Sequence, residues 1–211
     1  IVTPAAGKDW VHSDPSGRIP TFHGSFHGKI MSESLLAMIL HFNNGLHVQL
    51  QNQRNSKWER GLPFRRRRLE GQSVLILGYG NLGRESSALL ERLGLKVRGT
   101  KRSLAGEEGN NNLVQFDDAL ENLGEFDHVV SLLPGDESTR GLIGREHFQA
   151  MKRSAVFYSL GRGLAIREIE LVEALQEGEI AGAGLDVFEV EPLSVDSPLW
   201  LLPNVLVTPH T

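Results

Sequence analysis

The sequence predicts an α/β fold built on a doubly wound parallel sheet. From Gly71 onward, short apolar runs alternate with segments of helical period, which is typical of β-α-β units. The connections between these segments are short and regular, and a glycine follows several of the helical segments, where helices commonly end. These three observations favour a parallel sheet with helices packed on both of its faces.

The strands and helices of this sheet can be assigned in order along the chain. We expect strands at residues 73–77, 95–100, 113–116, 128–133, 155–160, 183–188 and 204–208. We expect helices at residues 81–94, 117–123, 144–151 and 166–178.

The segment before the first of these strands follows a different pattern. Met31, Leu35, Ile39 and Leu46 lie near one stripe of a helix, so we expect a single amphipathic helix over residues 31–50. The proline- and glycine-rich stretch upstream of it predicts a loop or hinge. Four consecutive arginines in the stretch FRRRRLEG predict a solvated turn in an acidic chain.

Composition restricts the possible functions. The net charge of −4 argues against a general nucleic-acid binder, and the absence of cysteine excludes disulfides and thiolate metal sites. No apolar run reaches the roughly 18 residues that a membrane-spanning helix needs, and the start does not resemble a signal peptide. We therefore predict a cytoplasmic protein that binds small molecules, with no nucleic-acid or membrane partner. Because the chain opens on IVTPAAGKDWV without a methionine, we expect that sequence upstream is missing.

A glycine-rich turn, GYGNLG, follows the first strand and opens a helix. In this position Gly78 permits the tight turn, Gly80 the approach of a pyrophosphate, and Gly83 close packing of helix and strand. The backbone amides around Asn81 and Leu82 would then point at the phosphates. The pattern predicts a Rossmann-type dinucleotide-binding domain, and the alternative is a packing turn without a ligand.

The end of the second strand, GTKRS, predicts which dinucleotide binds. Proteins that bind NAD usually place an acidic residue here, where it accepts hydrogen bonds from the adenosine ribose. Here Lys101 occupies that place and Arg102 follows, with Thr100 and Ser103 as further donors. Two cations suit the 2′-phosphate of NADP, so we predict NADP as the preferred cofactor over NAD. The alternative is a pair of solvated surface charges.

Three further stretches complete the pattern: SLGRG at 159–163, LDVFEVEP at 185–192 and LPNVLVTPH at 202–210. With GYGNLG they resemble, in order and spacing, the D-isomer-specific 2-hydroxyacid dehydrogenases. This family includes glyoxylate/hydroxypyruvate reductases, phosphoglycerate dehydrogenase and D-lactate dehydrogenase. The resemblance runs from about Pro4 to His210. It implies an oxidoreductase that transfers a hydride between NAD(P)H and a small 2-oxo acid.

The resemblance also implies the catalytic residues. Arg162 is similar to the arginine that grips the substrate carboxylate and polarises the carbonyl. His210 is similar to the catalytic acid and base, and Glu191 to its carboxylate partner. Reduction of a 2-oxo acid needs a proton on the carbonyl oxygen, and a neighbouring carboxylate stabilises the charged imidazole that supplies it.

Further binding residues follow from the same resemblance. Asp186 is expected to bond the nicotinamide carboxamide, and the backbone amides of Ala6 and Gly7 to hold the substrate carboxylate. The residues expected to line the rest of the cofactor site are Leu133, Pro134, Thr139, Leu160 and Gly161. We expect no metal site.

At the scale of domains, we expect residues 1–27 to be a remnant of an incomplete substrate domain with its hinge, and 28–211 to form the NAD(P)-binding domain. The resemblance to the family, together with the apolar stripe, predicts a homodimer with the 31–50 helix in the interface. A dinucleotide-sensing scaffold, like the corepressors that share this fold, is the alternative function. Formate dehydrogenase is disfavoured because those enzymes have glutamine where Glu191 stands.

Overall fold

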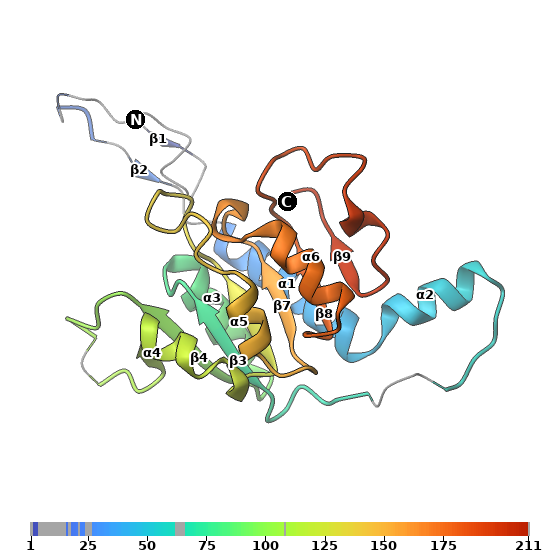
Figure 1. Ribbon diagram of the computed structural model, residues 1–211. Helices are drawn as coiled ribbons and strands as arrows, with labels where there is room; N and C mark the ends of the chain where they lie inside the picture. The colour runs from blue at the N-terminus through green and yellow to red at the C-terminus, as the bar shows by residue number, and fades with distance from the viewer. Residues whose placement is uncertain are drawn as a thin grey trace.

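The computed structural model describes residues 2–3, 16, 18–20, 22–23, 27–61, 66–107 and 109–210. The predicted α/β fold is confirmed: seven parallel strands form one sheet in the order β5-β4-β3-β6-β7-β8-β9 (Figure 1). The strands are β3 (Ser73–Leu77), β4 (Lys96–Lys101), β5 (Leu113–Gln115), β6 (His128–Ser131), β7 (Val156–Ser159), β8 (Gly182–Leu185) and β9 (Val205–Val207). Two short strands, β1 (Val2–Thr3) and β2 (Phe22–His23), pair with each other apart from this sheet.

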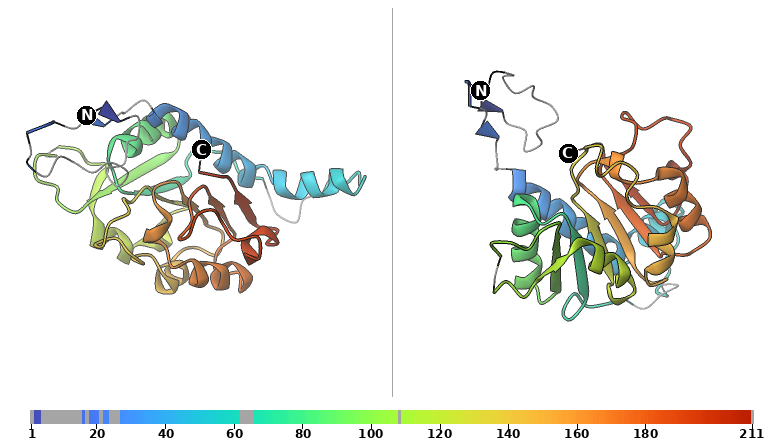
Figure 2. Two further views of the ribbon diagram at one scale, coloured as in Figure 1. Left: turned by 90° about the horizontal axis from the view of Figure 1, so that it is seen from above. Right: turned by 60° about the vertical axis from the view of Figure 1, so that its left-hand side comes forward.

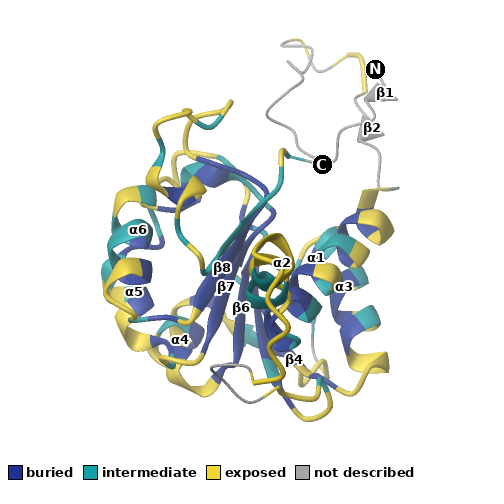
Figure 3. Cartoon of the chain, turned by 90° about the vertical axis from the view of Figure 1, so that its right-hand side faces the viewer, coloured by how far each residue is buried: buried dark blue, intermediate teal, exposed yellow. Residues whose placement is uncertain are grey.

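Helices cover both faces of the sheet, as the pattern predicted. Figure 3 shows α4, α5 and α6 on one face and α1 with α3 on the other. The helices are α1 (His27–Asn43), α2 (Leu46–Arg54), α3 (Asn81–Arg92), α4 (Phe116–Glu121), α5 (Arg145–Ala150) and α6 (Glu168–Gln176). Short 3-10 turns occupy Leu123–Glu125, Gly163–Ala165 and Pro198–Trp200.

The two layers of helix each close a separate apolar core. In β3, Val74 and Ile76 face the core under α1 and α3, whereas Leu75 and Leu77 face the core under α4, α5 and α6. Successive side chains of a strand point to opposite faces, so a strand covered on both faces needs an unbroken apolar run. This explains why the stretch SVLIL carries no polar residue after its first position.

The strand order reverses between β3 and β6. From β3 the chain winds outward through β4 to β5, then returns to β6 on the other side of β3 and continues to β9. In open parallel sheets, ligands bind beyond the carboxyl ends of the strands at such a reversal. The fold therefore directs attention to the loops that follow β3, β4 and β6.

The single helix predicted over 31–50 is wrong, because the chain breaks there into α1 and α2. Gly45 adopts a left-handed conformation with φ 64°, which favours glycine and turns the chain out of the α1 axis. Met31 and Leu35 are buried as predicted, but Leu46 lies beyond the break and is 41% exposed. Helix α2 projects away from the sheet (Figure 1; Figure 2, left view).

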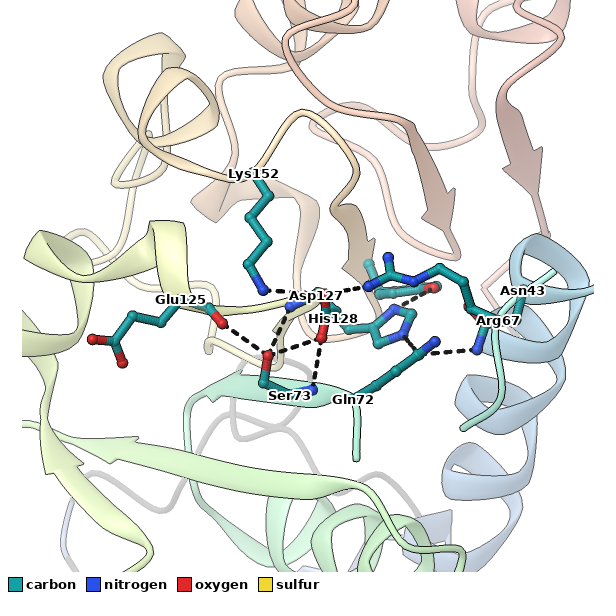
Figure 4. Close-up of polar contacts among 9 residues, drawn as sticks. Asn43, Arg67, Gln72, Ser73, Glu125, Asp127, His128 and Lys152 are labelled. Atoms are coloured by element: carbon teal, nitrogen blue, oxygen red, sulfur yellow. Dashed lines mark hydrogen bonds and ion pairs between the residues drawn. The ribbon is translucent and has the colours of Figure 1, made fainter. Parts of the chain in front are cut away.

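A polar cluster closes the opposite, amino edge of the sheet (Figure 4). The carboxylate of Asp127 accepts hydrogen bonds from Arg67 at 2.6 Å, Lys152 at 3.1 Å and the backbone N–H of Ser73 at 3.0 Å. The arginine run was predicted to be a solvated turn. Arg66, Arg67 and Arg68 are exposed as predicted; Arg68 pairs with Glu70, and Arg67 also pairs with Asp127.

Candidate active site

The glycine-rich turn lies at the carboxyl end of β3, directly before α3. Gly78 has φ 98°, and a Cβ there would lie 2.8 Å from the Leu132 carbonyl oxygen. A Cβ at Gly83 would lie 2.8 Å from the Gly78 carbonyl oxygen, so both glycines are needed for packing. At Gly80, by contrast, an added Cβ would meet no described atom within 4 Å. Gly80 and Asn81 are exposed and Leu82 is half-buried, so the start of α3 opens onto space outside the sheet.

The end of β4 brings cations to the same edge. Tyr79 N donates to Thr100 O at 2.9 Å, and Gly78 N donates to the Thr100 hydroxyl at 3.1 Å, which holds β4 against the turn. Thr100 itself is buried, so its side chain supports the turn from the interior of the domain. Lys101 ends β4 half-buried and forms an ion pair with Glu107.

The two residues after β4 are exposed. Arg102 donates from Nη2 to the Ser138 hydroxyl at 2.5 Å, which ties it to the loop after β6. The hydroxyl of Ser103 accepts a hydrogen bond from Ala105 N at 3.3 Å within its own loop. The structure thus directs Lys101 and Arg102 to different partners, although they are neighbours in the sequence.

The loop after β6 carries Pro134 exposed at the edge, while Leu133 belongs to the core. Thr139 is buried and its hydroxyl donates to the Pro134 carbonyl at 2.6 Å, so this side chain shapes the loop. After β7, Leu160 is buried, and a Cβ on Gly161 would lie 2.5 Å from the Leu133 carbonyl oxygen. These two loops are therefore packed against each other backbone to backbone.

Arg162 follows β7 at the same edge of the sheet. Its side chain is half-buried, and Nη1 donates to the Gly161 carbonyl at 2.9 Å. Its Cβ and Cγ lie close to Gly135, where an added Cβ would be 3.1 and 3.0 Å from them. The aliphatic stem is thus packed against the loop after β6, which limits where the guanidinium can point.

His210 and Glu191 form a close pair beyond β9 and β8. Nδ1 of His210 lies 2.7 Å from Oε2 of Glu191, and Oε1 of the same carboxylate accepts from Phe188 N at 3.0 Å. His210 has φ 53°, a conformation that is uncommon outside glycine, and its N–H donates to the Asp186 carbonyl at 2.9 Å. A carboxylate fixed on one imidazole nitrogen sets the ring orientation and favours a proton there, leaving the other nitrogen to exchange a proton with a ligand.

Asp186 is fully buried directly after β8. Its Oδ1 accepts from the Thr208 hydroxyl at 2.5 Å, and its N–H donates to the Ser159 carbonyl at 2.9 Å. Sequence reasoning missed Thr208, although its place two residues before His210 was a usable signal. It also missed Glu107, which pairs with Lys101 of β4 and with Arg84 of α3 only through the fold.

The predicted residues from Gly78 to His210 lie at or after the carboxyl ends of strands, and they extend across the sheet from β4 to β9. Ala6 and Gly7 lie outside the described residues. A surface cavity of about 700 Å³ lies at the opposite edge of the sheet, between the end of α1, residues 66–70 and the end of α3. Cavity volume therefore does not identify the candidate active site. Within the described residues, no cluster of His, Asp or Glu side chains is arranged to hold a metal ion.

Comparisons with known proteins identify the family of the chain. The family model for the D-isomer specific 2-hydroxyacid dehydrogenase, NAD binding domain, matches residues 36–211. A glyoxylate/hydroxypyruvate reductase B from Klebsiella pneumoniae is 43% identical over 141 residues, which cover 64% of this chain and 43% of the reductase. The chain spans 27% to 43% of the length of the curated relatives that it matches.

Solved structures of two relatives superpose on nearly the whole chain. One is a D-isomer specific 2-hydroxyacid dehydrogenase from Xanthobacter autotrophicus Py2 in complex with NADPH and MES, with a TM-score of 0.85 and 34% identity. The other is an NADPH-dependent glyoxylate/hydroxypyruvate reductase from Sinorhizobium meliloti in complex with NADP and sulfate, with a TM-score of 0.84 and 31% identity. Each match covers 99% of this chain and 67% of the other. The chain belongs to the D-isomer-specific 2-hydroxyacid dehydrogenase family, of which it carries the NAD-binding domain.

Proposed function

We propose that the protein reduces a small 2-oxo acid of the glyoxylate or hydroxypyruvate type to the D-2-hydroxy acid, with NADPH as the hydride donor. The observation that carries this proposal is the contact of 2.7 Å between His210 and Glu191 at the sheet edge that also presents the glycine turn. The relatives named as glyoxylate/hydroxypyruvate reductases support the substrate class.

The residues at the edge fit a dinucleotide. The open space around Gly80, at the start of a helix of 12 residues, suits a pyrophosphate, because the amino end of a helix dipole attracts anions. The buried Asp186 beyond β8 is proposed to bond the nicotinamide carboxamide. Lys101 and Arg102 at the end of β4 support NADP as the preferred cofactor. The complexes of relatives with NADPH and NADP support the same preference.

The proposed roles divide the reaction among three side chains. When bound, NADPH supplies the hydride for the carbonyl carbon. Arg162 would pair with the substrate carboxylate, since a planar guanidinium makes two parallel hydrogen bonds to such a group. His210, charged and held by Glu191, would donate its proton to the carbonyl oxygen as the negative charge develops there.

The division of the chain and its assembly belong to the same proposal. We propose residues 28–211 as the NAD(P)-binding domain and 1–27 as part of the substrate domain. We also propose a homodimer that uses α1 and α2, because α2 presents Leu46 and Leu50 with 41% and 46% exposure. The cytoplasmic location stays a prediction. No helix in the described part of the chain is both long and apolar enough to cross a membrane.

A substrate panel on the whole protein tests the function. Glyoxylate, hydroxypyruvate and pyruvate would be assayed with NADPH and with NADH, formate with NADP⁺ and with NAD⁺, and kcat/KM compared. We expect the highest value for glyoxylate or hydroxypyruvate with NADPH. Absence of turnover with every 2-oxo acid, together with tight dinucleotide binding, would instead identify a sensing scaffold. An equal or higher kcat/KM with NADH would contradict the proposed cofactor preference.

A further inference from the structure

Glu107 lies in the loop between β4 and β5, among the cations at the end of β4. Its Oε1 forms an ion pair with Nζ of Lys101 and lies 3.3 Å from Nη2 of Arg84, which donates to it. The side chains of Glu107 and Lys101 are only 20% and 25% exposed. One carboxylate therefore bridges two cations that come from different elements, β4 and α3.

Both cations border the expected position of the adenosine ribose. Lys101 ends the strand next to β3, and Arg84 lies in the first turn of α3, directly after the glycine turn. In dinucleotide-binding domains the residue at the end of this second strand faces the 2′ oxygen of that ribose. A phosphate on this oxygen would meet the same two cations that Glu107 now contacts.

We infer that Glu107 limits the preference for NADPH by occupying the 2′-phosphate position when no dinucleotide is bound. The inference rests on the proposed function, of which it names a specificity-determining residue. A 2′-phosphate must displace the carboxylate from Lys101 and Arg84, because two neighbouring negative groups repel each other. NADH has a free hydroxyl there, so it leaves both ion pairs intact and can donate a hydrogen bond to Glu107.

Arg102 does not take part in this competition. Its guanidinium donates to the Ser138 hydroxyl, which in turn donates to the Asp136 carboxylate in the loop after β6. The preference that Arg102 confers is therefore separate from the contribution that Glu107 opposes. A preference for NADPH over NADH that is inferred from Lys101 and Arg102 alone is therefore too large, because Glu107 already pairs with Lys101.

Isothermal titration calorimetry of the whole protein tests the inference with NADP⁺, NAD⁺ and the fragments adenosine 2′,5′-bisphosphate and AMP. In Glu107→Gln, which keeps the shape and removes the charge, we expect NADP⁺ and the bisphosphate to bind roughly tenfold more tightly, or about 1.4 kcal/mol. Binding of NAD⁺ and AMP should weaken or stay within about twofold, a change that corresponds to about 0.4 kcal/mol. Glu107→Ala should shift the ratio in the same direction.

Glu91→Gln is the matched control. It removes one negative charge from α3, where the carboxylate accepts a hydrogen bond from Asn112 and not from Lys101 or Arg84. An unchanged NADP⁺ to NAD⁺ ratio in both Glu107 variants overturns the inference, as does an equal shift in Glu91→Gln. If the unaltered protein binds neither dinucleotide, the proposed function fails and the inference fails with it. If it binds both but Glu107 has no effect, only the inference fails.

Discussion

Arg162 and His210 take different parts in the proposed reaction, and neither is proposed to bind the dinucleotide. We expect Arg162→Ala and His210→Ala each to lower kcat/KM by roughly 10² to 10⁴. Cofactor affinity should stay within about twofold, because the proposed pyrophosphate site follows another strand, β3. Steady-state kinetics and calorimetry with NADP⁺ measure the two effects separately.

Arg140→Ala is the control for Arg162, since Arg140 is an exposed arginine that pairs with Glu137 on the surface. His210→Gln keeps a polar side chain but cannot donate a proton as a charged imidazole does. A near-normal rate in His210→Gln or Arg162→Ala would remove these residues from the mechanism.

His128, in contrast, acts on stability at the opposite edge of the sheet. Its Nε2 lies 2.6 Å from the Gln72 side-chain oxygen, which only accepts, so Nε2 carries the proton and Nδ1 accepts from the Tyr158 hydroxyl at 3.1 Å. Burial lowers the pKa of His128 to about 4, against the opposing charge of Asp127. Both ring nitrogens therefore have a partner when the ring is neutral.

This shift predicts how stability depends on pH. The unfolded chain, with an ordinary histidine pKa near 6.5, binds the proton more readily than the folded chain does. The free energy of unfolding should therefore fall as pH falls from about 6.5 to about 4, by about 3 kcal/mol from His128. Urea unfolding of the chain and of His128→Asn between pH 7 and pH 4 measures it, and the variant should show the smaller slope.

His47→Asn provides the comparison, because burial also lowers the pKa of His47, in a ring that is only half-buried.

Protonation of Asp127 also lowers the free energy of unfolding, but at a lower pH. Burial would raise its pKa, but hydrogen bonds from Ser73, Arg67 and Lys152 hold the pKa well below its usual range. Its contribution is lost only as the pH falls below the unfolded value of 3.8. Equal slopes for the chain and His128→Asn would contradict the assignment.

At the scale of elements, the turn between β3 and α3 holds two glycines needed for packing, Gly78 and Gly83, and one, Gly80, that we propose for binding. Gly80 has φ −83° and open space at its Cβ position, so Gly80→Ala should change stability by less than about 0.5 kcal/mol. The added methyl group would nevertheless stand where the pyrophosphate approaches, so we expect NADP⁺ binding to weaken at least about tenfold. Thermal melting and calorimetry give the two values.

Gly83→Ala should show the reverse, with the larger effect on stability and the smaller one on NADP⁺ binding. Its Cβ would lie 2.8 Å from a backbone oxygen that cannot move away cheaply, so we expect a loss of stability of about 1 to 3 kcal/mol. If Gly80→Ala binds NADP⁺ normally while remaining folded, the turn is a packing feature and not a pyrophosphate site.

At the scale of the whole molecule, no residue of α2 is fully buried, and His47 packs against His41 and Phe42 of α1. Leu46 and Leu50 lie one turn apart on it, and exposed apolar residues in such a stripe favour association. We expect light scattering to show a dimer at micromolar concentration and a monomer after Leu46→Glu with Leu50→Glu. Val195→Glu, at a site that is 90% exposed in another loop, should leave the dimer intact. A monomeric unaltered protein would contradict the proposal.

Local patterns determined most of the fold and the glycine turn, whereas the candidate catalytic residues came from the resemblance to the family. The unbroken apolar run of β3, the glycines at Gly78 and Gly83 and the order of the motifs each depend on neighbours in the sequence, and each has a recognisable period or spacing. The break at Gly45 also had a local signal, the pair Asn44-Gly45, which the apolar stripe outweighed. Because strands that run parallel align their carboxyl ends, the motifs after them were bound to meet at one edge.

Only the tertiary structure decided which side chains are partners across that edge and at the opposite one. Arg67 meets Asp127 across 60 residues, and Lys101 and Arg84 share Glu107 because α3 and the loop after β4 lie together. Such contacts depend on the strand order and on how each connection returns to the sheet, and local periodicity in the sequence predicts neither. The sequence by itself therefore determined which groups are present at the ends of the strands, whereas the packing determined their partners, and so how much of the charge of Lys101 is left for a ligand.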